Sequence, residues 1–362
     1  MMTIKRPTFV INEGIARANI RRMAEKANAS GTIFRPHFKT HQSKDVGDWF
    51  RQEGVTKITV SSVSMAQYFA SHGWDDITIA FPYNPLEIDE INELASKIKL
   101  NVQIESREAL DHLLVTAKSP LGYFIKIDLG TRRTGLLHNQ SDIIQDLINR
   151  QTDKVAFRGL LSHAGHSYNA RSPRKILEMH EDSMKVIKLI QSKLDQEVFI
   201  SYGDTPSCSA LESFDGIDEI RAGNFVFYDI QQTNIGSCTM EDIAVAVFCP
   251  VVAVHHNRDE AVIYGGAIHM SKDHIKRGND DVYFGEVVTL TPSGWQYQGD
   301  AILDRVSQEH GIIKGSERFF RNLKVGDVVG ILPAHSCLTA NLASVYYNLS
   351  GERYEKMESN FY

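Results

Sequence analysis

The sequence predicts an α/β fold, a (β/α)8 barrel of the TIM type followed by a β-rich C-terminal domain. Short β-branched or aromatic runs alternate with segments of helical period, which is typical of successive parallel βα units. Eight such units occupy about two hundred residues, which is the size of a (β/α)8 barrel. The helical pattern nearly disappears after Asp229, where apolar runs joined by turns indicate a separate domain.

The barrel elements follow one another in chain order. Strands are expected at residues 32–39, 57–62, 76–81, 100–105, 122–128, 156–163, 198–203 and 219–227. Helices are expected at residues 46–52, 64–71, 85–97, 107–117, 141–149, 175–194 and 208–214. Several of these helices begin at Ser or Pro, as helix N-termini commonly do.

The second domain is expected to consist of strands joined by turns. These strands are expected at residues 243–255, 260–264, 285–290, 294–298, 311–313 and 327–332. We place the barrel at residues 12–238 and the β-rich domain at residues 239–362. Residues 1–11 are a candidate addition to the second domain.

The composition is that of an ordinary globular protein, with 42% hydrophobic and 23% charged residues among 362. A net charge of −6 without a basic cluster argues against nucleic acid as a partner, and no apolar run approaches the roughly 18 residues that a membrane span needs. The four cysteines are scattered, which argues against a disulfide framework. Because the first residues lack the apolar segment of a signal peptide, we expect a cytoplasmic protein with a small-molecule substrate.

Lys39 ends the first predicted strand and lies between His37 and His41. Active sites of (β/α)8 barrels lie at the C-terminal ends of the strands. Lys39 is therefore a candidate nucleophile. The alternative is a solvated lysine, since lysine side chains are mostly exposed. The roles of His37 and His41 stay open at this point.

Further polar residues follow the fifth and sixth strands. Asp128 and Arg133 follow the fifth strand, where an exposed ion pair of little energetic value is the alternative. His163 and His166 flank Gly165 after the sixth strand, which suggests close backbone approach to a bound group. Taken singly, each histidine could instead be structural.

Glycines follow the seventh and eighth strands, at Gly203 and Gly223. Loops at these places in such barrels often bind phosphate through backbone amides and a helix N-terminus. Thr205 can add a hydroxyl group, whereas Asp204 would repel a phosphate unless its side chain turns away. The alternative is that both glycines only form tight turns.

A lysine at strand one, an arginine at strand five and a phosphate site at strands seven and eight fit pyridoxal 5′-phosphate. This cofactor needs an amine for a Schiff base, a cation for its phenolate oxygen and amide donors for its phosphate. Lys39 must lose a proton to react, and burial and neighbouring imidazolium charge would lower its pKa.

His335 and Cys337 follow a strand of the second domain. Residues two apart on an extended segment point to the same face, and imidazole with thiolate is a zinc-like ligand set. Two protein ligands leave coordination positions open, which suits a catalytic metal. The alternative is a buried free cysteine near a surface histidine.

Taken together, these motifs resemble the fold-type III pyridoxal phosphate enzymes that include D-serine dehydratase, D-threonine aldolase and D-threo-3-hydroxyaspartate dehydratase. Alanine racemase is a more distant relative. The resemblance covers nearly the whole chain. The matching stretches are residues 35–41, 128–135, 163–168, 203–207, 221–229, 307–311 and 333–337.

The resemblance implies a role for each site residue. Lys39 resembles the Schiff-base lysine, Arg133 the cation at the cofactor phenolate and Tyr168 the group near the pyridine nitrogen. The implied phosphate cradle with its neighbours is Tyr202, Gly203, Thr205, Gly223, Asn224 and Tyr228. His335 and Cys337 resemble the metal ligands, with zinc favoured and manganese or cobalt as alternatives. His166 joins Lys39 in the catalytic set.

The resemblance also implies a homodimer with shared active sites. In this family the β-domain of one subunit covers the barrel mouth of the other. His335 and Cys337 could therefore serve the partner's Lys39.

The implied reaction is elimination of water from a D-configured β-hydroxy amino acid, which gives a 2-oxo acid and ammonia. Lys39 would act as general base on the Cα hydrogen while the metal helps the hydroxyl group to leave. The alternatives are retro-aldol cleavage to glycine and an aldehyde with His163 or His166 as base, racemisation, a non-enzymatic pyridoxal phosphate carrier, and a cofactor-free barrel hydrolase. The family's aldolases more often carry His-x-Asp at the metal site, so Cys337 favours elimination. The sequence leaves the choice of D-amino acid open.

Overall fold

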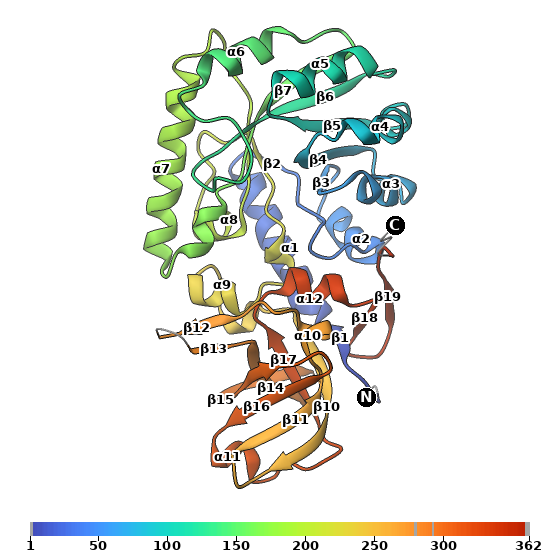
Figure 1. The fold of residues 1–362 in the computed structure, drawn as a ribbon, viewed down its shortest axis with the longest axis vertical. Helices are drawn as coiled ribbons and strands as arrows, with labels where there is room; N and C mark the ends of the chain where they lie inside the picture. Colours follow the sequence, from blue (N-terminus) through green and yellow to red (C-terminus); the bar gives the residue numbers. More distant parts are fainter. Residues whose placement is uncertain (1–2, 279–280, 292, 359–362) are drawn as a thin grey trace.

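The N-terminal part of the chain forms a closed parallel β-barrel (Figure 1). The computed structural model describes residues 3–278, 281–291 and 293–358. In that part of the chain, eight strands pair in the order β2-β9-β8-β7-β6-β5-β4-β3. A bridge between His37 and Thr59 joins the two ends of this sheet, and the Phe38 amide donates to the Thr59 carbonyl at 2.8 Å. The fold class predicted from the sequence is therefore confirmed.

The barrel strands lie near the predicted runs. Their bounds are β2 (Ile33–Phe34), β3 (Ile58–Val60), β4 (Asp76–Pro82), β5 (Lys99–Ile104), β6 (Leu121–Ile127), β7 (Val155–Ser162), β8 (Ile200–Tyr202) and β9 (Glu219–Ile220). The first and last strands are much shorter than expected. Pro36 has no amide hydrogen to pair after β2, and a 3-10 turn at Asn224–Val226 replaces the end predicted for β9.

Helices surround the barrel on its outer face (Figure 1). Their bounds are α2 (Lys44–Gln52), α3 (Val63–Ser71), α4 (Ile88–Ala95), α5 (Arg107–Thr116), α6 (Ser141–Asn149), α7 (Pro173–Gln191) and α8 (Thr205–Ala210). Serine side chains cap the N-termini of α2, α3, α5 and α7, as the sequence pattern indicates. Helix α1 (Glu13–Ala29) precedes the first barrel strand and was not predicted.

The second domain is built on a nine-stranded sheet in the described part of the chain. The order is β11-β16-β15-β14-β17-β10-β1-β18-β19, and β10 also pairs with β11, so the first six strands close into a second barrel. These strands are β10 (Val245–His255), β11 (Glu260–Tyr264), β14 (Gly285–Thr291), β15 (Gly294–Val306), β16 (His310–Gly315) and β17 (Val328–Pro333). The N-terminal strand β1 (Thr8–Ile11) pairs with β10 and with β18 (Val345–Asn348), whose other neighbour is β19 (Arg353–Glu355).

Short helices lie where the two domains meet (Figure 1). They are α9 (Ile230–Ile235), α10 (Ala267–Met270) and α12 (Ser336–Leu342), whereas α11 (Glu317–Phe320) and the small ribbon β12 (Ile275–Arg277) with β13 (Asp281–Tyr283) belong to the second domain. The Gln231 amide donates to the Ala334 carbonyl at 3.1 Å, which ties α9 to the segment that leads into α12. In the described residues, none of the helices combines the length and the apolar character of a membrane span.

Candidate active site

A cavity of about 730 Å³ opens at the C-terminal ends of the barrel strands. Residues on or directly after each of the eight strands line it, and α12 of the second domain closes one side. Eight of the residues to which the resemblance gave a site role line this cavity. They are Lys39, Arg133, Tyr168, Thr205, Gly223, Asn224, His335 and Cys337. The structure therefore brings the predicted lysine, cation, glycine loops and metal ligands into one space.

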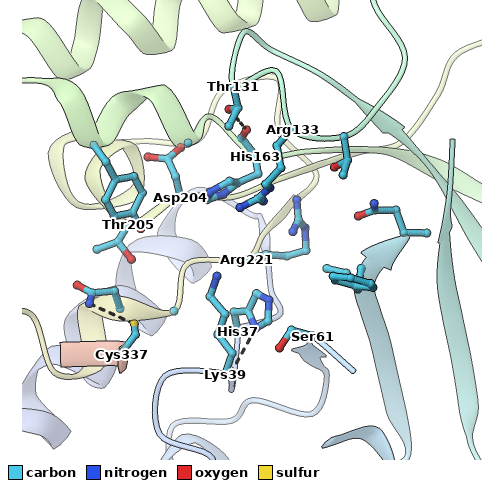
Figure 2. A pocket seen from close by; sticks show the side chains of 18 of the residues that line it. His37, Lys39, Ser61, Thr131, Arg133, His163, Asp204, Thr205, Arg221 and Cys337 are labelled. Carbon is cyan, nitrogen blue, oxygen red and sulfur yellow. Dashed lines mark hydrogen bonds between the residues drawn. The ribbon is translucent and has the colours of Figure 1, made fainter. Parts of the chain in front are cut away.

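Lys39 extends into the middle of the cavity. Figure 2 shows its amine between Cys337 on one side and His37 and Arg221 on the other. Two side chains hold its backbone: the Lys39 amide donates to His37 Nδ1 at 3.4 Å, and Gln42 Nε2 donates to the Lys39 carbonyl at 3.1 Å. The turn that follows β2 thus directs the amine toward the barrel axis.

The pKa of the Lys39 amine lies below its ordinary value. Burial is the main cause, and the Arg133 and Arg221 guanidinium groups lower it further, while Cys337 opposes them. The expectation that neighbouring imidazolium groups lower the pKa of Lys39 is wrong for two reasons. Burial lowers the pKa of His37 and His163 so far that both imidazoles are neutral near pH 7. The cationic neighbours are arginines.

The cavity wall opposite Cys337 is cationic. Arg221 is buried, and its guanidinium donates to Ser201 Oγ at 2.7 Å and to the Ser162 carbonyl. Lys126 is also buried, and burial followed by the charges of Arg221 and Arg133 lowers its pKa to about 7. A wall of this charge suits an anionic ligand.

Sequence reasoning assigned no role to Lys126 or Arg221. Lys126 lies on β6, two residues before Asp128, and Arg221 lies just after β9, two residues before Gly223. Side chains two positions apart on an extended segment share a face, and Asp128 and Gly223 were already candidate site residues from the sequence. That alternation was the available signal. Buried hydrogen bonds connect Arg221 to a carboxylate: Arg221 donates to Ser201 Oγ, and Ser201 Oγ donates to Glu219, each at 2.7 Å.

The glycine loops form a cradle with unpaired polar atoms. Thr205 Oγ1 and Asn224 Oδ1 are buried and have no hydrogen-bond partner among the described residues. A Cβ at Gly223 would lie 2.8 Å from the His37 carbonyl oxygen, and one at Gly203 would lie 2.9 Å from Arg221 Cβ. With the buried amine and the arginines, these groups fit the phosphate, aldehyde and phenolate of pyridoxal 5′-phosphate.

Asp204 is directed mainly toward α8. Its Oδ1 accepts from Ser207 N at 2.7 Å and from Ser167 Oγ at 2.9 Å, so the carboxylate caps the helix. Burial raises the pKa of Asp204, against the hydrogen bonds that lower it. A phosphate beside Asp204 requires that the carboxylate turn away. Oδ1 does so, whereas Oδ2 has no hydrogen-bond partner among the described residues and Asp204 lines the cavity.

His335 and Cys337 meet at the N-terminus of α12. His335 is the N-cap residue and Cys337 the second residue of the helix, so the expectation of an extended segment is wrong. Cys337 Sγ lies 3.2 Å from Thr40 Oγ1 and 3.4 Å from Asn224 Nδ2. Although burial raises it, the pKa of Cys337 is lowered overall by His335 and Lys39. A thiol that ionises readily beside an imidazole is a suitable donor pair for a metal.

Asp229 is the second neighbour of His335. His335 Nδ1 lies 3.0 Å from Asp229 Oδ2, and the carboxylate is fully buried. Burial opposes the charged imidazole, but Cys337 and Asp229 outweigh it and raise the pKa of His335 well above its ordinary value. Among the described residues, no group of three or more histidine, cysteine or acidic side chains is arranged to hold a metal. A metal at this pair would complete its coordination with water or substrate.

The expectation that His335 and Cys337 serve a partner's lysine is not met. Both line the same cavity as Lys39 of their own chain, and the charge of Cys337 acts on that Lys39. The physical reason is the position of α12, which follows β17 and packs at the mouth of its own barrel (Figure 1).

Four predicted site residues lie outside the cavity lining, namely Gly203, Tyr202, Tyr228 and His166. Tyr202 bonds His180 Nδ1 and Ser207 Oγ, each at 3.3 Å, and Tyr228 bonds Ser209 Oγ at 2.9 Å. His166 belongs to the 3-10 turn Gly165–Asn169 and does not line the cavity. These side chains are directed into the protein around the site, which the motif alone could not show.

His163 takes the place expected for His166. Its Nδ1 bonds the Gly203 carbonyl, which leaves Nε2 without that partner at the cavity wall. His37 also lines the cavity. His41 does not, because it packs against Phe38 and Phe50 with ring centroids at 4.4 Å and 5.6 Å. Of the histidines left open by the sequence, His41 is a packing residue.

Comparisons with known proteins match this architecture. The sequence model of the alanine racemase N-terminal domain matches residues 11–230, and that of the serine dehydratase domain matches residues 244–349. D-serine dehydratase of Schizosaccharomyces pombe is 30% identical over 95% of this chain and 88% of the relative. D-serine dehydratase of Dictyostelium discoideum is 29% identical over 96% and 93%. The solved D-threo-3-hydroxyaspartate dehydratase from Delftia sp. HT23 superposes on this chain with a TM-score of 0.90 and is 26% identical to it. The match covers 99% of this chain and 98% of that one. A mutant of an enzyme of the same name has been solved in a metal-free form.

Proposed function

Because this chain belongs to the fold-type III pyridoxal phosphate enzymes, with an alanine racemase N-terminal domain and a serine dehydratase domain, we propose that it is a D-serine dehydratase-like lyase. It removes water from a D-configured β-hydroxy amino acid and yields a 2-oxo acid and ammonia. The observation that carries this proposal is the convergence of Lys39, His335 and Cys337 of one chain on one cavity. A carrier protein would need the lysine but not the other two.

The groups that would hold pyridoxal 5′-phosphate are spread over the cavity. Lys39 would bind its aldehyde, Arg133 would face its phenolate oxygen, and Tyr168 would lie toward the pyridine nitrogen. The loops at Thr205 and Gly223 would hold its phosphate, with a free hydroxyl and close backbone approach as support. When bound, the cofactor supplies an electron sink for negative charge at the substrate Cα.

His335 and Cys337 would hold a divalent metal at the opposite side of Lys39. Thiolate and imidazole favour zinc, with manganese or cobalt as alternatives. When bound, the metal acts as a Lewis acid on the β-hydroxyl group of the substrate. Because the chain supplies two ligands, coordination positions remain for that hydroxyl group.

Lys39 Nζ is the group placed to move the Cα proton. Its lowered pKa increases the fraction of neutral amine near pH 7, which a general base requires. The Arg221 guanidinium, which Ser201 Oγ holds at 2.7 Å, favours binding of the anionic substrate carboxylate without reorganisation. Thr40, bonded to Cys337 Sγ, keeps the thiol on the side of the cavity that faces Lys39.

Retro-aldol cleavage is the second candidate, and His163 is the observation that favours it. The His163 imidazole is neutral, and its Nδ1 is occupied by the Gly203 carbonyl, so Nε2 is free to accept a proton from a β-hydroxyl group. Racemisation needs a second acid/base group on the opposite face of the substrate, usually a tyrosine from the β-rich domain, and no such tyrosine lines the cavity in the described part of the chain. Tyr168 is the one tyrosine among the described residues that line the cavity, and it belongs to the barrel.

We further propose that the protein is a homodimer. Phe81 and Leu338 line the cavity, yet 57% and 48% of their surfaces are exposed. Apolar side chains at a cavity mouth are typical of a covered surface. Sedimentation velocity would show a single species of twice the chain mass, and a monomer at micromolar concentration would contradict the dimer. The cytoplasmic location stays a prediction from the sequence.

Product analysis tests the reaction. The purified protein, supplied with pyridoxal 5′-phosphate and Zn²⁺, is incubated with D-serine, D-threonine and D-threo-3-hydroxyaspartate, with L-serine as the control. We expect 2-oxo acid and ammonia from at least one D-amino acid and nothing from L-serine. Glycine with an aldehyde would favour the aldolase. A colourless protein without near-visible absorbance after cofactor addition would refute the whole proposal.

A further inference from the structure

Asp229 is a fully buried carboxylate that the proposed reaction does not use. It is the N-cap residue of α9, and its Oδ1 accepts from the Gln232 amide at 2.9 Å. This cap accounts for one of its two oxygens. Since an unpaired buried charge is costly, the partners of the second oxygen need an explanation of their own.

The second oxygen, Oδ2, accepts hydrogen bonds from two other segments. The Ser336 amide donates at 2.9 Å, and His335 Nδ1 lies at 3.0 Å, both from the start of α12. Asn224 Nδ2 donates at 2.8 Å from the loop that follows β9. One carboxylate oxygen therefore ties the glycine loop of the barrel to the helix that carries both candidate metal ligands.

The bond to Asp229 decides which nitrogen of His335 is available. A carboxylate accepts a proton-bearing Nδ1, which leaves Nε2 as the nitrogen with a lone pair. Histidine ligands of metals commonly donate their other ring nitrogen to a carboxylate in this way, which fixes the tautomer and the ring orientation. His335 and Cys337 are two residues apart at the start of α12 and line the same cavity, so both candidate ligands face one space.

Asn224 extends the same arrangement to the second ligand. Its Nδ2 reaches Cys337 Sγ at 3.4 Å as well as Asp229 Oδ2, while its Oδ1 is buried without a partner among the described residues. We infer that Asp229 is a positioning residue that orients His335 for a divalent cation and, through Asn224, holds that site against the cofactor cradle. This inference rests on the proposed function for the presence of a metal.

Asp229→Asn separates positioning from helix capping. Asparagine is as good an N-cap as aspartate, so its Oδ1 can keep the bond to the Gln232 amide. Its Nδ2 then stands where Oδ2 was, and it faces the donors of His335 and Asn224. The cap survives, whereas the acceptor that orients the imidazole is lost.

Asp242→Asn is the matched control. Asp242 also accepts from a backbone amide at a helix start, Thr239 N at 2.8 Å, and pairs with Arg22 at 2.6 Å, but within the described part of the chain it bonds neither His335 nor Cys337. A general effect of losing a capping carboxylate would therefore appear in both variants.

The experiment measures metal affinity rather than turnover. The cofactor-loaded chain is freed of metal, and Zn²⁺ is titrated in competition with a chromophoric chelator. We expect Asp229→Asn to bind Zn²⁺ about 10- to 100-fold more weakly than the parent chain, and Asp242→Asn to match the parent. The near-visible band of the cofactor and the thermal midpoint should stay close to those of the parent.

A Co²⁺ spectrum supplies a readout that a structural role would not move. In Asp229→Asn we expect the thiolate charge-transfer band from Cys337 to persist while the ligand-field bands shift, because only the imidazole is misplaced. Unchanged Zn²⁺ affinity would overturn the inference, and so would a parallel loss of the cofactor band and the thermal midpoint. A parent chain that binds Zn²⁺ as expected but turns over no D-amino acid would refute the proposed function and leave this inference standing.

Discussion

Gly223 lies where the loop after β9 passes the end of the first barrel strand. A Cβ at this position would lie 2.8 Å from the His37 carbonyl oxygen and 2.9 Å from His37 Cβ. Carbon and oxygen atoms in contact settle at roughly 3.3 Å, so Gly223→Ala must separate the two segments by about 0.5 Å. The His37 amide also donates to the Ala222 carbonyl at 2.9 Å, and the same movement stretches that bond.

The strain falls on the cofactor site. Overpacking of this kind costs about 1–3 kcal/mol. Lys39 lies two residues after His37, and Asn224 follows Gly223, so any relaxation moves both sides of the site. If the empty site relaxes and the filled site does not, the dissociation constant of pyridoxal 5′-phosphate rises by about 5- to 150-fold.

The assay is a cofactor titration of the apoprotein, followed by near-visible absorbance. Gly14→Ala is the control, because a Cβ there meets only Asn12 Oδ1 at 3.5 Å, which is an ordinary contact. We expect the control to bind the cofactor like the parent chain. A Gly223→Ala chain that retains the parent's dissociation constant would refute this role of Gly223, and so would equal weakening of cofactor binding in both alanine variants.

Three further outcomes are expected. Lys39→Ala should lose the near-visible band of the lysine-linked cofactor, and a retained band would refute the assignment. Cys337→Ala, or treatment of the parent chain with a chelator, should abolish turnover while the cofactor stays bound, and full activity in a metal-free preparation would contradict this. Burial lowers the pKa of His41 to about 3, whereas an unfolded chain binds this proton near pH 6.5. The stability contributed by the neutral imidazole is therefore complete above about pH 6.5. It is lost as the pH falls toward 3, at about 1.4 kcal/mol per pH unit. His41→Asn should be less stable at pH 7 but lose less of its free energy of unfolding between pH 6.5 and 4 in urea titrations, and parallel pH curves for the two chains would disprove the role of His41.

Local patterns determined much of the barrel and part of the site. Periodicity of two or of about 3.6 residues is a property of neighbouring positions, so β4 to β7 and the helices between them could be read from the sequence. Lys39 at a strand end and glycines after the last two strands were equally local. The ability of His335 and Cys337 to bind a metal depends on their residue types, so it could be inferred from the sequence alone.

Tertiary structure decided which side chains face the cavity and what supports them. His163 and His166 are three residues apart, yet only the first lines the cavity, because the 3-10 turn at Gly165–Asn169 rotates the second away. Arg221 is held by Ser201, 20 residues away, and Asp229 meets His335 across 106 residues. Contacts at such separations leave no periodic signal in a single chain.

The same limit explains the error about the metal ligands. The sequence placed His335 and Cys337 on an extended segment that could serve a partner subunit, whereas α12 brings them to the Lys39 of their own chain. Residue types in the sequence determined that an amine, an arginine and a thiolate were available. Only the packing of α12 against the barrel mouth decided that they act in one cavity, because that packing depends on contacts between residues about three hundred positions apart, such as Thr40 with Cys337 at a separation of 297.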